Sequence, residues 1–245
     1  MILTRIFPIP DGATTPISLE SPDARERILE LYRPPRADWV RLNLIGTLSG
    51  SAVGPDGTSD TITNPVDRII LRTIRSLADV VVVGAQSVRA EAYFAPQHAA
   101  LAVVSRSGDL SGRAAPSSSD HGQLIVLCPE DAVARARETV ADPSAEVISV
   151  ADVGGSLSAT AIVDTLRAAG CNSIVAEGGP TLAAHLLRGG VIDELCLTTS
   201  PQLDGARLPL FGADEFAAVP LALTQLLIDD ASATYARWAA QRIPN

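Results

Sequence analysis

From Trp39 onward, short runs rich in valine and isoleucine alternate with longer segments whose apolar residues recur at helical spacing. A short continuous apolar run is typical of a strand that is buried on both faces, as in a parallel sheet covered by helices. Strands that alternate with helices predict an α/β fold. The expected strands are Val40–Leu48, Val80–Val83, Leu101–Val104, Leu124–Leu127, Val147–Val150, Ile174–Ala176 and Leu195–Thr199.

The segments between these runs predict helices with recognisable ends. Asn64 followed by Pro65 is an N-cap with proline at the first helical position. Ser156 precedes the apolar spacing of a later helix, and Gly170 follows its last periodic residue, as a C-terminal cap does. The expected helices are Pro65–Ala78, Ala85–Ala92, Asp131–Glu138, Leu157–Ala169 and Thr181–Arg188.

The two ends of the chain follow other patterns. Leu223–Asp229 and Ala233–Trp238 predict an antiparallel hairpin that closes a mostly parallel sheet. The first 35 residues contain six prolines and show helical spacing only over Asp23–Leu31. We therefore expect an N-terminal arm with one short helix over residues 1–35, packed on the domain or on a neighbouring subunit. A single α/β domain should occupy residues 36–245.

Charge and composition exclude several classes of function. The chain has 19 basic and 28 acidic residues, a net charge of −9, so nucleic acid and anionic membranes are poor partners. No apolar run approaches the roughly 18 residues of a membrane span, and no signal-peptide pattern begins the chain, so we expect a cytoplasmic protein. The three cysteines form no C-x-x-C pair, which predicts buried free thiols. No histidine has a second ligand at metal spacing, so no metal is expected.

One segment offers the clearest candidate for ligand binding. In IVAEGGPTLAAHLL, residues 174–187, a buried strand ends at Glu177, and a helix begins directly after Gly178 and Gly179. Backbone N–H groups at a helix N-terminus suit a dinucleotide pyrophosphate, and glycine lets the ligand approach the backbone. The G-x-G-x-x-G spacing of a Rossmann fold is absent. The same turn can also serve only to reverse the chain.

Three further segments follow strands. Gly84 precedes another helix start, so two helix N-termini could face one crevice. Ser105 and Arg106 could bind the 2′-phosphate of NADPH, although an arginine in this position is often merely solvated. The glycine- and serine-rich segment 44–63 could form the lid or floor of a small-molecule site, or an irregular surface loop. Residues 108–121 also predict a surface loop.

The order of these motifs is more specific than any one of them. The motifs are TLSG at 47–50, GTSDTIT at 57–63, LRTIRSLADVVVVGAQSVRAE at 71–91, VSRS at 104–107, AEGGPTL at 176–182 and VIDELCLTTSPQLDG at 191–205. Together they resemble the reductase domain of bacterial riboflavin-biosynthesis deaminase–reductases, over roughly residues 36–240. The resemblance implies a three-layer dihydrofolate-reductase-like fold, a homodimer, and NADPH-dependent reduction of 5-amino-6-(5-phosphoribosylamino)uracil, whose ribose becomes a ribityl chain.

The resemblance and the motifs above together assign the candidate site. NADPH is expected at Ile45, Thr61, Gly84, Ser87, Glu91, Ser105, Arg106, Gly178, Gly179, Pro180, Thr181 and Leu182. The substrate is expected at Ser59, Arg75 and Glu177. Glu177 is the expected catalytic residue, because a carboxylate at the strand end could orient ribose hydroxyls or relay a proton.

Several family features are replaced or missing. The sequence TLSGS, residues 47–51, stands where the family usually has S-L-D-G-K, so serines replace a carboxylate and a cation. The arginine that usually follows a D-D-P-x-L stretch is absent from residues 91–96, and the zinc ligands of the deaminase half are absent. Three hypotheses follow: a reductase of the riboflavin pathway acting alone, an NADPH reductase of another heterocycle such as a pterin, or a nucleotide-binding protein that has lost turnover.

Overall fold

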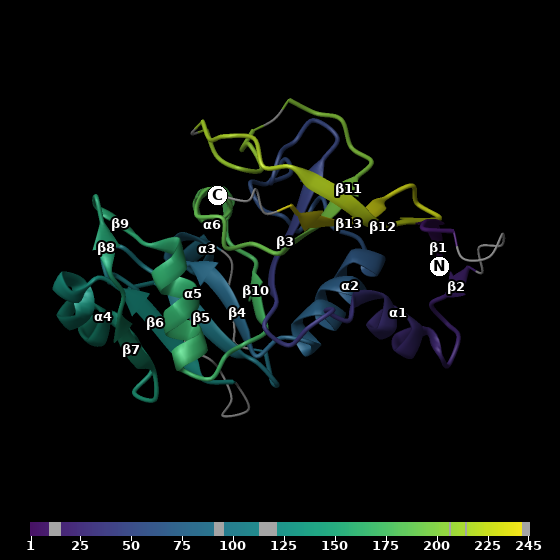
Figure 1. Ribbon diagram of the computed structural model, residues 1–245. Coiled ribbons are helices and arrows are strands. Elements are labelled where there is room, and N and C mark those ends of the chain that lie inside the picture. The colour runs from purple at the N-terminus through teal and green to yellow at the C-terminus, as the bar shows by residue number, and fades with distance from the viewer. Residues whose placement is uncertain (10–15, 91–95, 113–121, 206, 214, 242–245) are drawn as a thin grey trace.

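The alternating pattern folds into one large sheet with helices on both faces (Figure 1). The computed structural model describes residues 1–9, 16–90, 96–112, 122–205, 207–213 and 215–241. The strand order is β2-β1-β12-β13-β11-β3-β10-β4-β5-β6-β7. The strands of this sheet are β1 (Ile2–Phe7), β2 (Ile17–Ser18), β3 (Val40–Thr47), β4 (Val80–Gly84), β5 (Ala100–Val104), β6 (Leu124–Cys128), β7 (Glu146–Ser149), β10 (Ile174–Ala176), β11 (Glu194–Ser200), β12 (Leu221–Asp229) and β13 (Thr234–Ala240).

The sheet has a parallel and an antiparallel part. From β11 through β3, β10, β4, β5 and β6 to β7, neighbouring strands all run parallel. On the other side of β11, strands β13, β12, β1 and β2 pair antiparallel. The predicted mostly parallel sheet and its C-terminal hairpin are therefore confirmed, each with strand ends within two residues of the expected ones.

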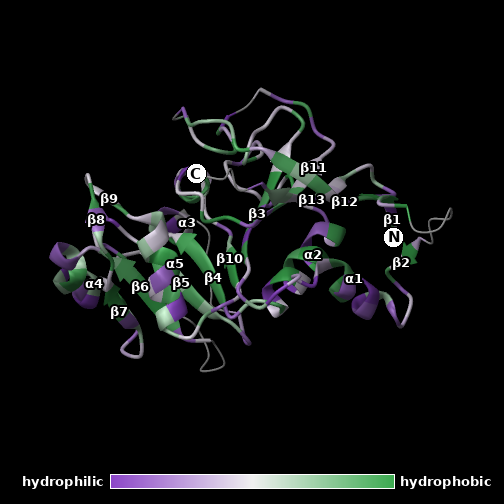
Figure 2. Ribbon diagram, viewed as in Figure 1, coloured by the Kyte–Doolittle hydropathy of each residue, from purple (hydrophilic) through white to green (hydrophobic). Residues whose placement is uncertain are grey.

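Helices cover the two faces and make a three-layer arrangement. The helices are α1 (Ala24–Tyr32), α2 (Pro65–Ser76), α3 (Ala85–Ala90), α4 (Val133–Thr139), α5 (Ala159–Ala168) and α6 (Pro180–Arg188), with a 3₁₀ turn η1 at Glu130–Ala132. In β4, Val80 and Val82 face the core formed with α5 and α6, whereas Val81 and Val83 face α3 and α4. The central strands are hydrophobic along their length because both faces are buried (Figure 2).

Two of the predicted helix boundaries are confirmed, and one is wrong. The side chain of Asn64 accepts the N–H of Asp67 at 2.8 Å, with Pro65 at the first helical position. Gly170 ends α5 with a φ of +88°, a backbone conformation that suits glycine. Ser156 does not cap α5, because Ser156–Leu157 forms strand β9 and pairs with β8, Asp152–Val153. Ser158 is the N-cap and accepts the N–H of Ala161 at 3.3 Å.

The N-terminal arm contains the expected helix and two unexpected strands, β1 and β2. Helix α1 matches the prediction within one residue at each end. Strand β1 was not predicted; it pairs antiparallel with β12, near the other end of the chain. Leu3 and Ile28 are buried in the same core cluster as Tyr235, so the arm packs on its own sheet. The division at residue 35 stays a prediction.

The remaining expectations concern loops, cysteines and membranes. Residues 108–112 contain no helix or strand, and the rest of the predicted loop, residues 113–121, lies outside the described residues. Cys128, Cys171 and Cys196 are free and buried, as predicted. None of the helices in the described ranges has the length and apolar character needed to cross a bilayer.

Candidate active site

The candidate site lies where parallel strands of the sheet end. Strand β10 lies between β3 and β4, with Ala176 opposite Leu42 and Val82. The N–H of Glu177, the next residue, donates to the carbonyl of Val82 at 2.9 Å. In open α/β sheets, ligands bind in the crevice beyond the carboxyl ends of the strands. This register therefore places Glu177 and the glycine turn that follows it at the edge where a ligand is expected.

Glu177 forms a bidentate ion pair with Arg75, which lies in the last turn of α2. The Arg75 Nε lies 2.8 Å from Glu177 Oε1, and Nη2 lies 2.5 Å from Oε2. The Glu177 side chain is 4% exposed and that of Arg75 is 24% exposed. The planar fork of the guanidinium fixes the orientation of the carboxylate. The structure thus joins two of the three expected substrate residues.

The two glycine turns lie beside each other. A Cβ added to Gly179 would stand 3.1 Å from the Ser87 Oγ, so the start of α6 meets α3. Among the described residues, nothing lies within 4 Å of a Cβ added to Gly84. Neither glycine has a positive φ, so backbone strain does not require glycine at these positions. Both glycines leave the backbone open to an approaching group.

Gly178 has a different role in the same turn. A Cβ on Gly178 would stand 2.7–2.9 Å from the side chain of Leu182, so packing within the protein requires glycine there. Pro180 is the first residue of α6 and has no N–H, and Gly179 provides no side chain to cap the helix. The N–H groups of Thr181 and Leu182 are therefore the donors that this helix start offers to an anion.

The loop after β3 and the loop after β11 form one wall. The N–H of Leu48 donates to Gln202 O at 2.9 Å, and that of Ala52 to Leu208 O at 2.8 Å. Ile45 is half-buried near the end of β3, and Ser59 lies in the loop that follows. Thr61 is exposed and donates to the Asp56 carboxylate at 2.8 Å. These hydrogen bonds hold segment 44–63 against the segment that contains Gln202 and Leu208.

A carboxylate that sequence reasoning did not select lies in this wall. Asp204 accepts hydrogen bonds from Ser49 Oγ at 2.7 Å and from Thr47 Oγ1 at 3.2 Å. The partners are 155 and 157 residues apart in the chain, so only the pairing of β3 with β11 brings them together. The resemblance expects an aspartate at the position of Ser49. The Asp204 carboxylate, which Ser49 contacts, lies next to that position.

Arg106 is committed to acidic neighbours. Its Nη2 lies 3.0 Å from Asp152, its Nη1 lies 3.4 Å from Asp131, and its Nε donates to the carbonyl of Gly155 at 3.1 Å. These acids border a hollow of about 360 Å³ beside the ends of β6 and β7. Ser105 is buried, and its N–H donates to Leu127 O. Arg106 is therefore half-exposed and paired with two aspartates. The predicted contact of Glu91 lies outside the described residues.

Comparison with known proteins identifies the family of this chain and structures with a similar fold. Residues 38–234 match the family described as the RibD C-terminal domain. A pyrimidine reductase-like protein of Corynebacterium diphtheriae superposes with a TM-score of 0.73 at 23% identity, over 89% of this chain and 99% of that one. Riboflavin biosynthesis reductase Rib7 of Saccharomyces cerevisiae has a TM-score of 0.65 at 13% identity, over 88% and 98%.

A bifunctional protein is similar over part of its length. The diaminohydroxyphosphoribosylaminopyrimidine deaminase/5-amino-6-(5-phosphoribosylamino)uracil reductase of Thermotoga maritima has a TM-score of 0.67 at 21% identity, over 84% of this chain. This chain spans 57% of that protein. A search of curated proteins finds no match. The expected α/β fold of three layers is confirmed, and these structures share it.

Proposed function

Because the chain belongs to the RibD C-terminal domain family, we propose that it is an NADPH-dependent reductase of the riboflavin-pathway type. Its substrate is 5-amino-6-(5-phosphoribosylamino)uracil, and its product carries a ribityl chain. The buried Arg75–Glu177 pair, at the strand end beside the two glycine turns, is the observation on which this proposal depends. A fixed carboxylate beside an open backbone suits a reaction in which ribose hydroxyls must be oriented.

The glycine turns fit a dinucleotide. At Gly84 the described residues leave open space, and at Gly179 the Cβ position meets the Ser87 Oγ; the N–H groups of Thr181 and Leu182 at the start of α6 would face the pyrophosphate. Ser87, Ile45 and Thr61 would complete the contacts with the cofactor. NADPH, when bound, supplies the hydride. Arg106 fits less well, because Asp131 and Asp152 compete with a phosphate for its guanidinium.

The protein's own residues orient the substrate. Arg75 holds Glu177 so that the carboxylate accepts hydrogen bonds from sugar hydroxyls and can hold a proton at an Oε atom. Ser59, Ser49 and Asp204 line the adjoining wall with hydroxyl and carboxylate groups. These groups suit the hydroxyl groups of a sugar, which a pterin ring lacks, and this favours the phosphoribosyl compound over a pterin.

A direct assay tests this proposal. Purified protein is mixed with NADPH and 5-amino-6-(5-phosphoribosylamino)uracil, and the absorbance of the reduced nicotinamide is followed. We expect oxidation that depends on both protein and substrate. Oxidation with a dihydropterin alone would replace the substrate assignment. Binding of NADPH in calorimetry without turnover of either substrate would show a nucleotide-binding protein instead.

We also propose that the protein forms a homodimer. The resemblance implies one, and strand β2 lies at an edge of the sheet, where unpaired backbone groups are available to a second copy. Light scattering at micromolar concentration should give twice the chain mass of 25.5 kDa. A mass of one chain would contradict the proposal.

A further inference from the structure

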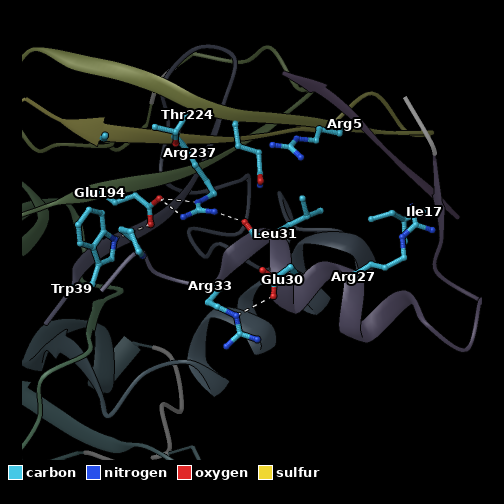
Figure 3. A pocket seen from close by; sticks show the side chains of 13 residues that line it. Arg5, Ile17, Arg27, Glu30, Leu31, Arg33, Trp39, Glu194, Thr224 and Arg237 are labelled. Carbon is cyan, nitrogen blue, oxygen red and sulfur yellow. Dashed lines mark hydrogen bonds and ion pairs between the residues drawn. The ribbon is translucent and has the colours of Figure 1, made fainter. Parts of the chain in front are cut away.

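A second candidate site lies between α1 and the antiparallel strands (Figure 3). It is a cavity of about 740 Å³, within the range that is usual for small-molecule sites. Trp39 and Glu194 border it at the amino ends of β3 and β11, whereas the glycine turns follow the carboxyl ends of β4 and β10. The cavity therefore shares no position with the proposed reductase site.

Strand register directs three polar side chains of the sheet into this cavity. Arg5 on β1 is opposite Leu227 on β12, and Gln225, two residues before Leu227, is opposite Arg237 on β13. Side chains two apart on a strand, and directly opposite across a pair, share one face of a sheet. Arg5, Gln225 and Arg237 therefore lie on the face that α1 covers, and all three line the cavity.

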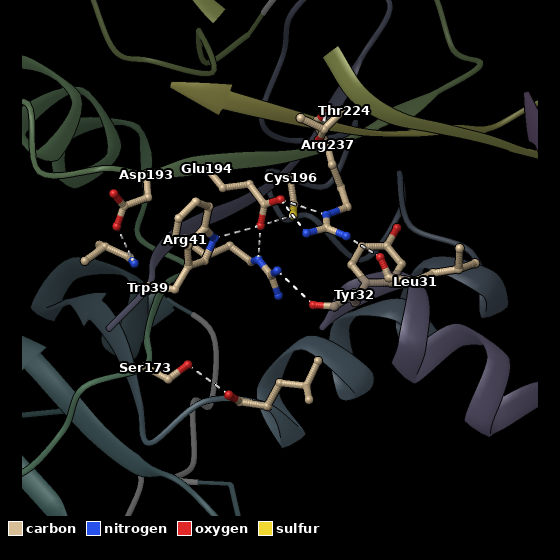
Figure 4. A network of polar contacts seen from close by, with 12 residues as sticks. Leu31, Tyr32, Trp39, Arg41, Ser173, Asp193, Glu194, Cys196, Thr224 and Arg237 are labelled. Atoms are coloured by element: carbon tan, nitrogen blue, oxygen red, sulfur yellow. Dashed lines mark hydrogen bonds and ion pairs between the residues drawn. The ribbon is translucent and has the colours of Figure 1, made fainter. Parts of the chain in front are cut away.

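Two guanidinium groups meet the single carboxylate of Glu194 beside the cavity (Figure 4). Arg41 Nε lies 2.5 Å from Glu194 Oε2, and Arg237 Nε lies 2.7 Å from Oε1 of the same carboxylate. The side chains of Arg41, Arg237 and Glu194 are 3%, 12% and 3% exposed. One carboxylate thus faces two guanidinium groups, and a buried charge without a counter-ion is unfavourable.

The neighbouring groups do not add negative charge to this cluster, because the adjacent buried carboxylate of Asp193 is paired with Arg36 at 2.8 Å. Burial raises the pKa of the Cys196 thiol to about 12, so it is neutral at physiological pH. Burial also raises the pKa of the Tyr32 hydroxyl well above its ordinary value. Among the charged residues that line the cavity, Arg5, Arg27, Arg33 and Arg237 outnumber Glu30 and Glu194. This positive lining contrasts with the net charge of −9 of the whole chain.

Two donors that line the cavity have no hydrogen-bond partner within the described part of the chain. Gln225 is 3% exposed, and its Nε2 is buried without a partner among the described residues. The same holds for the Nε of Arg5. Buried polar groups are almost always hydrogen-bonded, so an unpaired buried donor calls for an acceptor from outside the chain. Both donors would be satisfied by oxygen atoms within the cavity.

We infer that this cavity binds a small organic anion through its phosphate or carboxylate group. The anionic oxygens accept hydrogen bonds from Arg5 and Gln225 and offset the excess charge of Arg237. Leu31 and Trp39, also in the lining, provide apolar surface for the rest of the molecule. This site is additional to the proposed reductase activity and does not depend on it.

Titration with two simple anions tests this inference. Inorganic phosphate and citrate are titrated at constant ionic strength against chloride, with calorimetry as one readout. Trp39 fluorescence is the second, in a Trp238→Phe background that removes the other tryptophan of the chain. We expect saturable binding of at least one anion, with one site per chain. Arg5→Gln and Gln225→Leu should each weaken it at least tenfold, which is about 1.4 kcal/mol or more.

A matched variant controls for net charge. Arg25 is exposed on the same helix α1 and does not line the cavity, so Arg25→Gln should change affinity less than twofold. Thermal midpoints on the same samples show that each variant is folded. Equal weakening in Arg25→Gln and Arg5→Gln would mean general attraction and would overturn the inference. Failure of wild-type protein to bind either anion would overturn it as well. Neither result depends on NADPH oxidation.

Discussion

The two candidate sites treat their arginines in opposite ways. At the carboxyl ends of the parallel strands, Arg75 meets Glu177 one to one, and Arg106 meets two aspartates. Beneath the antiparallel strands, Arg41 and Arg237 share the single carboxylate of Glu194. The first arrangement neutralises its cations and leaves the side chains fixed, which suits orientation of a neutral part of a ligand. The second leaves positive charge in excess, which suits attraction of an anion.

The two sites also differ in how accessible their main chain is to a ligand. The reductase site contains two glycines whose Cβ positions are open or nearly open, so its main chain is accessible. The second candidate site, the cavity lined by Arg5, Gln225 and Arg237 (the arginine cavity), lies on the face of a sheet. The backbone there is already paired, so only side chains reach a ligand. In a site that uses main-chain N–H groups, the start of a helix binds the phosphate, and the identity of the side chains matters less. A site made of side chains depends on strand register, so single substitutions should affect it sharply.

The largest expected effect is that of Glu177→Gln on turnover. Loss of the carboxylate removes a group that orients sugar hydroxyls and holds a proton, and such groups contribute roughly 10²–10⁴ in rate. The amide keeps the shape of the carboxylate but weakens its ion pair with Arg75; because the cofactor is expected at the glycine turns, NADPH affinity should stay within about twofold. Steady-state rates and calorimetry on the same preparation separate the two quantities. Turnover close to that of the wild type would show that Glu177 has no part in the reaction.

Next in size is the loss of stability in Glu194→Gln. This change leaves the two buried guanidinium groups without a counter-ion, which typically costs about 3–5 kcal/mol. Burial by itself raises the pKa of Glu194, but the charges of Arg41 and Arg237 outweigh it and hold the pKa below its usual value. This contribution to stability is present above the unfolded pKa of about 4.3 and is lost as the pH falls through the folded value. Urea unfolding from pH 7 to 3 should show that dependence in the wild type and less of it in the variant.

Gly179→Val should reduce cofactor affinity by about a hundredfold or more, since a bulky side chain would obstruct the approach of a pyrophosphate to the backbone. In the free protein the new Cβ meets only Ser87 Oγ, at 3.1 Å, so we expect little change in thermal midpoint. Gly178→Ala provides the contrast, because its Cβ would collide with Leu182 and should lower stability instead. A folded Gly179→Val protein with unchanged NADPH affinity would contradict the site assignment.

Local sequence patterns predicted the parallel part of the fold because its signals are local. The all-valine strand β4 and the Asn64-Pro65 cap each specify their element without distant partners. Strand β1 could not be predicted in the same way. It contains Arg5 and is followed by prolines, and it exists because β12, more than 200 residues away, pairs with it. Ser156 was misassigned for a related reason, since a short hairpin with β8 competes with the helix start.

The two sites differ in the same respect. The glycine turns are visible in sequence, and Arg75 and Glu177 came from a family resemblance, because 102 residues separate them. Asp204 and the arginine cavity required the register of β3, β11 and β13. One signal was nevertheless present. Arg41, Glu194 and Arg237 are charged residues within otherwise uncharged strands, and a charge in a buried strand implies a partner on the same face.

The smallest expected effect, and the one that most sharpens the comparison of the two sites, is that of Arg106 on cofactor choice. If its guanidinium contacts the 2′-phosphate, Arg106→Ala should weaken NADPH binding about tenfold, near the lower limit for a charge-assisted hydrogen bond, and leave NADH unchanged. The effect should be no larger because the phosphate must displace the contacts with Asp131 and Asp152. Asp152→Asn removes one competitor and should therefore strengthen NADPH binding several-fold, again without affecting NADH. Calorimetry with both cofactors on the three proteins decides the matter: equal affinity of the wild type for NADPH and NADH would show that these acids keep Arg106 from the cofactor.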